Sequence, residues 1–154
     1  METIVGVLQE VKGHTFDIIY DLYFTEERLI GVLIQHPSEL INSQSSFSWQ
    51  NLLLGNTFSK RKEQDELNRL ADEVRSKNKA MTPSELATCR RGNYEIRYKS
   101  IANLEIKTSI LGTSMKITHT NPANKGISFG LTKKQAKEVL PLLERFIPAK
   151  LKGK

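Results

Sequence analysis

Short runs of β-branched and aromatic residues recur along this chain, and they constrain the fold more than any other feature. Strands favour these residue types because their side chains pack well on a pleated, half-buried surface. In one run Tyr94, Ile96 and Tyr98 alternate with charged residues, as expected for a strand with one buried face. Short polar turns between several runs favour antiparallel neighbours. We therefore predict a mainly β fold with about seven antiparallel strands, at residues 3–11, 16–24, 29–34, 94–99, 104–107, 115–119 and 127–131.

A long charged segment separates the third predicted strand from the fourth. Residues 59–79 carry a narrow apolar stripe at helical spacing, formed by Leu67, Leu70, Ala71 and Val74. A second, shorter helix is expected after Thr82, because Thr82 and Glu85 have the spacing of a capping box and Pro83 suits the first helical position. The sequence thus predicts a helical insert at about residues 47–90.

A final helix is predicted at the end of the chain, where Thr132 and Gln135 again have the spacing of a capping box. Pro141 falls inside this helix and predicts a kink, since proline removes a backbone donor and crowds the preceding turn. We expect Leu140 and Leu143 to be buried against the sheet. The apolar face consists of Ala136, Val139, Leu140, Leu143, Phe146 and Ile147.

Length and composition favour a single domain in residues 1–148, followed by a basic flexible tail at 149–154. No apolar run approaches the length of a membrane-spanning helix. The sequence starts without the basic and apolar regions of a secretory signal, and it has one cysteine, Cys89. A cytoplasmic location is therefore expected.

Charge is distributed unevenly along the chain. Residues 1–58 hold two basic and seven acidic residues, whereas residues 59–154 hold the other 21 basic and 10 acidic residues, so the two parts carry −5 and +11. A basic surface can contact phosphates of nucleic acids or anionic lipids, although a solvated surface is the simpler interpretation. The candidate anion-contacting residues are Lys60, Arg61, Lys62, Arg90, Arg91, Arg97 and Lys99.

An aromatic and aliphatic segment precedes the charged helix, at residues 47–58. Trp49, Leu52 and Leu53 would share one face if this segment were helical. We favour the interpretation that the segment seals one side or end of the barrel. A contact with a partner or with a second copy is the next alternative. A membrane-interface helix is a third, because a basic cluster follows at residues 60–62.

No residue pattern indicates catalysis. His14, His36 and His119 lie far apart in the sequence and show no metal-ligand spacing. Cys89 is followed by two arginines that could lower its pKa, but no histidine lies close to it in the sequence. We therefore predict no catalytic residue, no metal site and no cofactor, and a protein that is not an enzyme.

Four segments resemble prokaryotic pleckstrin-homology-like (PH-like) proteins: LYFTEERLIG at 22–31, IRYKSIANLEI at 96–106, MKIT at 115–118 and ISFGLTKKQA at 127–136. The resemblance covers about two-thirds of the chain and implies a barrel whose open end is plugged by the C-terminal helix. In having a helical insert between strands 3 and 4, the chain is similar to a subset of these proteins. Relatives of this fold bind lipids, peptides or other proteins, but the first predicted hairpin offers only Lys12 and His14 where phosphoinositide-binding members have several basic residues.

Together these features predict a non-enzymatic binding or scaffolding module that recognises a protein partner or a second copy of itself. One alternative is a peripheral membrane module that uses residues 47–58 and the basic cluster after them. A second is a weak nucleic-acid binder, which rests on net charge alone because no aromatic ladder is present to stack bases. The candidate partner-contact residues are Trp49, Leu52, Leu53, Leu67, Leu70 and Val74.

Overall fold

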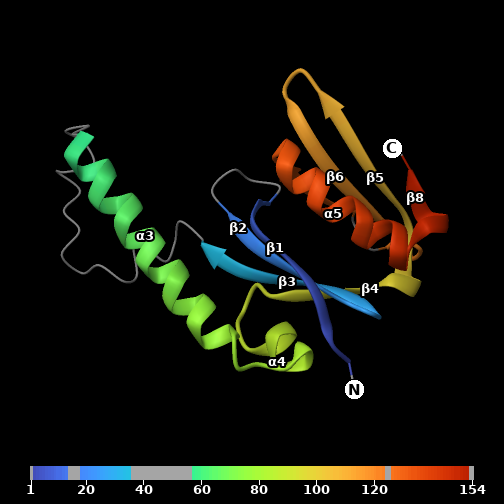
Figure 1. Ribbon diagram of the computed structural model, residues 1–154, viewed down its shortest axis with the longest axis horizontal. Helices are drawn as coiled ribbons and strands as arrows, with labels where there is room; N and C mark the ends of the chain where they lie inside the picture. The colour runs from blue at the N-terminus through green and yellow to red at the C-terminus, as the bar shows by residue number, and fades with distance from the viewer. Residues whose placement is uncertain (1, 14–17, 36–56, 124–125, 153–154) are drawn as a thin grey trace.

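Two antiparallel meanders make up one open sheet in the computed structural model, which describes residues 2–13, 18–35, 57–123 and 126–152 (Figure 1). The strand order is β4-β3-β2-β1-β7-β6-β5-β8, so the meanders join where Lys12 of β1 pairs with Gly130 of β7. The predicted mainly β fold is confirmed. The strands are β1 (Ile4–Lys12), β2 (Ile19–Thr25), β3 (Arg28–Gln35), β4 (Tyr94–Arg97), β5 (Ile101–Ser109), β6 (Gly112–His119), β7 (Ile127–Leu131) and β8 (Leu151–Lys152).

The predicted helices also form. Between β3 and β4 lie α3 (Thr57–Asn78) and α4 (Pro83–Thr88), and α5 (Lys133–Phe146) follows β7. Both predicted capping boxes are present, at Thr82 with Glu85 and at Thr132 with Gln135. Helix α5 runs across Pro141 as one element; this residue is exposed, so water can satisfy the carbonyl group that lacks its donor. Two short 3-10 turns complete the described chain, η1 (Tyr98–Ser100) and η2 (Pro148–Lys150).

The main core lies between the two meanders and α5. On β6, Thr113, Met115 and Ile117 are buried and alternate with exposed residues, as the period of a strand requires. Helix α5 contributes Val139 and Leu143 to this core. Leu140 packs at its margin and is only partly buried, so the prediction that Leu140 is a buried core residue is wrong. The reason is that Val139 and Leu143 lie one helical turn apart and define the centre of the buried face.

A second, smaller core lies on the other face of β3. Ile30, Val32 and Ile34 pack there against residues of α3 and α4. Seven of the eight residues of β3 are buried, which is expected only when both faces of a strand are covered. The insert therefore covers the sheet and forms part of the domain.

The end of the described chain differs from the expected flexible tail. Residues 148–150 form η2, and Leu151 and Lys152 pair in parallel with Leu104 and Glu105 of β5. Lys150 is held as well, because its Nζ donates a 2.7 Å hydrogen bond to the carbonyl oxygen of Tyr98. The chain is thus fixed to the sheet up to Lys152.

Replacing Leu143 with alanine should lower the free energy of unfolding by about 2–5 kcal/mol, because the side chain is buried in the main core and leaves a cavity. The matched variant Leu140→Ala should cost less than half as much, since Leu140 is only partly buried. Chemical denaturation of both variants measures the difference. Equal losses would contradict the placement of α5.

Candidate functional site

Helix α3 is fixed to the sheet by apolar packing and by a hydrogen bond. Ala71 is buried and Val74 is partly buried in the second core, against the face of β3 that carries Ile30, Val32 and Ile34. The side-chain amide of Gln35 donates a 3.2 Å hydrogen bond to the carbonyl oxygen of Leu67. The described side-chain contacts of α3 with the sheet thus come from its C-terminal half.

A buried ion pair adds to this apolar contact. Asp21 of β2 is fully buried, and Arg75 of α3 donates to both of its carboxylate oxygens, from Nε at 2.7 Å and from Nη2 at 2.9 Å. These hydrogen bonds from Arg75 raise the pKa of its guanidinium above the ordinary value. A fully buried carboxylate is tolerated only with such charge-assisted partners. Arg75 therefore joins the insert to the second strand.

The backbone of β1 also supports Asp21. Glu10 lies where the register of β1 with β2 shifts between Leu8 and Val11, and its φ of 58° is in the left-handed region. Its amide donates a 3.0 Å hydrogen bond to Oδ1 of Asp21. Its carboxylate lies 3.8 Å from Nη1 of Arg75. The β-bulge thus aims one donor and one acidic side chain at the ion pair.

A second polar cluster centres on Arg28, which is buried at the start of β3. Its guanidinium donates to both carboxylate oxygens of Glu2, at 2.7 and 2.9 Å, and to Oγ of Ser84 in α4 at 3.0 Å. It also pairs with the carboxylate of Glu95 in β4. The hydrogen bonds from Arg28 hold the pKa of Glu2 below its ordinary value. Arg28 thereby connects the N-terminal segment, β4 and the insert.

The predicted partner-contact residues divide into two groups. Trp49, Leu52 and Leu53 lie outside the described residues, as does all of the segment 47–56. Val74 belongs to the second core, whereas Leu67 and Leu70 are partly buried and lie outside both cores. The structure therefore separates Val74, which packs on the sheet, from Leu67 and Leu70, which precede it along α3 and lie outside both cores.

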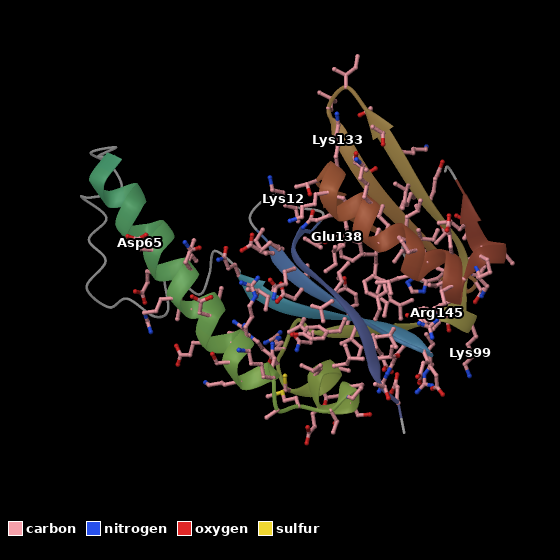
Figure 2. The ribbon with its side chains drawn as sticks, in the orientation of Figure 1. Lys12, Asp65, Lys99, Lys133, Glu138 and Arg145 are labelled. Carbon is pink, nitrogen blue, oxygen red and sulfur yellow. The ribbon has the colours of Figure 1, made fainter. Side chains whose placement is uncertain are left out.

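The predicted anion-contacting residues belong to different elements of the fold. Lys60, Arg61 and Lys62 belong to α3, but their side chains are outside the description. Arg91, Arg97 and Lys99 are exposed; Arg91 follows α4, Arg97 ends β4, and Lys99 lies in η1 (Figure 2).

Arg90 has a structural role that its sequence position did not indicate. Its Nη1 donates a 2.8 Å hydrogen bond to the carbonyl oxygen of Leu33, while Oδ1 of Asn93 accepts one from the amide of Leu33 at 2.8 Å. Partial burial lowers the pKa of Arg90 below its ordinary value. Together, Arg90 and Asn93 satisfy the backbone of β3 beyond the end of its pairing with β4.

A feature that the sequence analysis missed lies at the turn between β5 and β6. Ile110 and Leu111 form a two-residue connection between paired Ser109 and Gly112. Their relative exposures are 105% and 98%, whereas the other exposed large apolar residue in the described chain, Val7, reaches 42%. The available signal was the apolar pair itself, because hairpin turns of this length usually carry polar residues or glycine.

The described residues form no metal-binding cluster: no three of their His, Cys, Asp or Glu side chains gather in a way that could hold a metal ion. Cys89 is exposed, and its Sγ lies 3.5 Å from the amide nitrogen of the Asn93 side chain. None of the described helices is both long and apolar enough to cross a bilayer. Comparisons with protein-family models, curated proteins and solved structures found no match to the chain.

Replacing Arg75 with methionine should lower the free energy of unfolding by about 3 kcal/mol, because Asp21 would remain buried without its guanidinium partner. The matched control is Arg69→Met in the same helix. Arg69 is exposed, and among the described residues its ion pairs are with Glu66 and Glu73 of the same helix, so this change should alter stability little. Adding Asp21→Asn to Arg75→Met should recover part of the loss. Equal denaturation midpoints for the two single variants would contradict the proposed anchoring.

The lowered pKa of Glu2 predicts a pH dependence of stability. The ion pair with Arg28 contributes fully above the ordinary carboxyl value of 4.5 and is lost as the pH falls through the lower folded-state pKa. Glu2→Gln should therefore be less stable than the wild type at pH 7, and the difference should shrink as the pH falls below 4.5. Denaturant titrations between pH 7 and pH 2.5 measure it. A difference that stays constant across this range would contradict the assignment.

Proposed function

We propose that this chain is a non-enzymatic binding module that presents helix α3 to a protein partner. The observation that carries the proposal is the one-sided attachment of this 22-residue helix. Its described contacts with the sheet run from Leu67 to Arg75, and Figure 1 shows its N-terminal half running out beyond the sheet. Such a geometry suits an arm that is held at its base and contacts another molecule along its length.

The base of this arm is rigid, which favours a presenting role. The fully buried Asp21 binds Arg75 through two hydrogen bonds, and Ala71 packs against β3. A helix fixed in this way loses little conformational entropy on binding a partner, which increases affinity for a given contact area. The Asp21–Arg75 pair is therefore proposed to orient the arm.

The face of α3 that continues beyond the anchor supports the same proposal. Leu67 and Leu70 lie one turn before Ala71 and Val74 on the same side of the helix and are partly buried. The opposite side carries the exposed, mixed charges of Asp65, Arg69, Asp72 and Glu73. An apolar edge next to a solvated face is the pattern of a helix that packs into a groove of a partner.

We further propose that the domain has the PH-like fold. The support is the strand order, in which a four-stranded meander joins a three-stranded one through β1 and β7, followed by a C-terminal helix that packs on the core. The packing of α5 on the core agrees with the resemblance, which implies a barrel plugged by this helix, although the strands form an open sheet. Binding is favoured over catalysis because the charged groups of the two buried clusters, around Asp21 and Arg28, are engaged with structural partners.

The double variant Leu67→Ser/Leu70→Ser tests the arm. It should keep the wild-type denaturation midpoint within experimental spread but lose partner binding by about tenfold or more, since two apolar contacts are removed from the interface. The matched control, Asp65→Ser/Asp72→Ser, changes two exposed residues on the other side of α3 and should retain the partner.

The measurement has two parts. Proteins retained from native lysate by the wild type and both variants are quantified side by side, and the retained protein is then purified and titrated against all three. Light scattering shows whether the retained protein is a second copy of the chain. Equal retention by the Leu67/Leu70 variant and the wild type would contradict the proposal, as would retention of no protein by the wild type.

A further inference from the structure

The tip of the β5–β6 hairpin exposes two adjacent large aliphatic side chains. Ile110 and Leu111 are as exposed as residues in an extended chain, at 105% and 98%. Single exposed aliphatic residues are common on protein surfaces, but two in a row at the end of a protruding hairpin are not. Figure 1 shows the tip of this hairpin extending beyond the start of helix α5. The pair forms a small convex apolar knob.

The knob is held in place by its own turn. The amide of Leu111 donates a 3.2 Å hydrogen bond to Oγ of Ser109, and this hydroxyl donates to the carbonyl oxygen of Gly112 at 3.3 Å. Gly112 has a φ of 135°, which suits glycine and allows the chain to re-enter β6. The hydroxyl groups of Thr108 and Thr113 lie 3.4 Å apart below the turn. These contacts keep the two aliphatic side chains pointed outward.

Lysines surround this end of the sheet. Thr113 pairs with Leu131, so α5 begins beside the turn and carries exposed Lys133 and Lys134 there. Lys12 lies across β7 from the same end of β6, because it pairs with Gly130 and Gly130 pairs with Ser114. Figure 2 shows Lys133 beside the hairpin, at the start of α5, and Lys12 farther from the hairpin tip.

Further charges at this end come from β5 and from the second turn of α5. Lys107 precedes the turn and Lys137 follows on α5, and both are exposed. Among the described residues, Glu105 lies 3.5 Å from Lys107 and Glu138 lies 4.0 Å from Lys134. The described lysines at this end of the sheet therefore outnumber the glutamates that pair with them.

The position of two of these lysines is unfavourable within the isolated molecule. Lys133 and Lys134 occupy the first turn of α5, which contains no acidic residue. The helix macrodipole places partial positive charge at this end, so lysines there are repelled and acidic residues would be preferred. An external anionic surface would compensate the lysines and the helix terminus together.

We propose that this end of the domain docks on an anionic lipid bilayer, with Ile110 and Leu111 inserted at the boundary between the headgroups and the acyl chains and the lysines against acidic headgroups. A bilayer accepts a convex apolar knob without a complementary pocket, and acidic headgroups attract lysines near the surface. The surface differs from the segment 47–58 that the sequence analysis considered for membrane contact, and it is independent of α3, which extends in another direction (Figure 1).

Sedimentation with vesicles tests this proposal. Purified chain is mixed with vesicles of phosphatidylcholine containing 30% phosphatidylserine, and separately with pure phosphatidylcholine. The wild type should bind the anionic vesicles, and Ile110→Ser/Leu111→Ser should reduce the partition coefficient by about tenfold or more. Lys133→Gln/Lys134→Gln should also weaken binding and should reduce its dependence on salt.

Matched controls separate this surface from general effects. Val7→Ser changes another exposed apolar residue away from the hairpin, and Lys77→Gln/Lys79→Gln removes two exposed lysines at the end of α3; both should bind as the wild type does. Denaturation midpoints show that each variant is folded.

Absence of wild-type binding to anionic vesicles, equal binding to neutral vesicles, or unchanged binding by the Ile110/Leu111 variant would overturn the proposal. Loss of a protein partner on changing the knob, without vesicle binding by the wild type, would also overturn it. Because α3 is unchanged in these variants, failure here leaves the proposed partner binding untouched.

Discussion

Burial of β3 on both faces is the constraint on which the rest of the structure depends. One face carries Leu29 into the main core, and the other carries Ile30, Val32 and Ile34 into the second core. Without α3 and α4 the latter three side chains would face water, each at a cost of about 1.5–3 kcal/mol relative to burial. The insert is therefore part of what makes the sheet stable.

The same constraint explains why polar groups are found inside the domain. Covering the outer face of β2 and β3 also buries Asp21, and a buried carboxylate needs strong donors. Arg75 and the amide of Glu10 supply them. The left-handed backbone at Glu10 and the orientation of α3 thus each bring a hydrogen-bond donor to the buried carboxylate of Asp21. These contacts fix the base of the helix with respect to the sheet.

Local features were predictable from the sequence, whereas contacts between distant segments were not. The capping boxes at Thr82 and Thr132 are short-range patterns, and both form as predicted. The pair of Asp21 with Arg75 joins residues 54 positions apart, and nothing in the sequence marks Arg75 among 23 basic residues. One signal was present but unused: residues 29–34 are apolar without alternation, which already indicates a strand covered on both faces.

The candidate sites, too, could be predicted only where they depend on local sequence patterns and not on contacts between distant segments. The apolar spacing in α3 was visible, but it could not show that Val74 packs on the sheet while Leu67 and Leu70 lie outside both cores. Arg90 was predicted to contact an anion, but its guanidinium donates a hydrogen bond to the carbonyl oxygen of Leu33. The exposed pair Ile110 and Leu111 becomes meaningful only when the register of β5 with β6 places it at a turn and the register of β6 with β7 brings the lysines of α5 beside it.

The central claim is that the base of α3 belongs to the same cooperative unit as the sheet that it covers. Native-state amide hydrogen exchange tests this directly, because it reports the free energy of opening for each segment. The account predicts that the amides of residues 71–78 and those of β3 exchange with similar, high protection, and that Arg75→Met lowers the protection of both. Rapid exchange throughout residues 71–78 while β3 stays protected would contradict it.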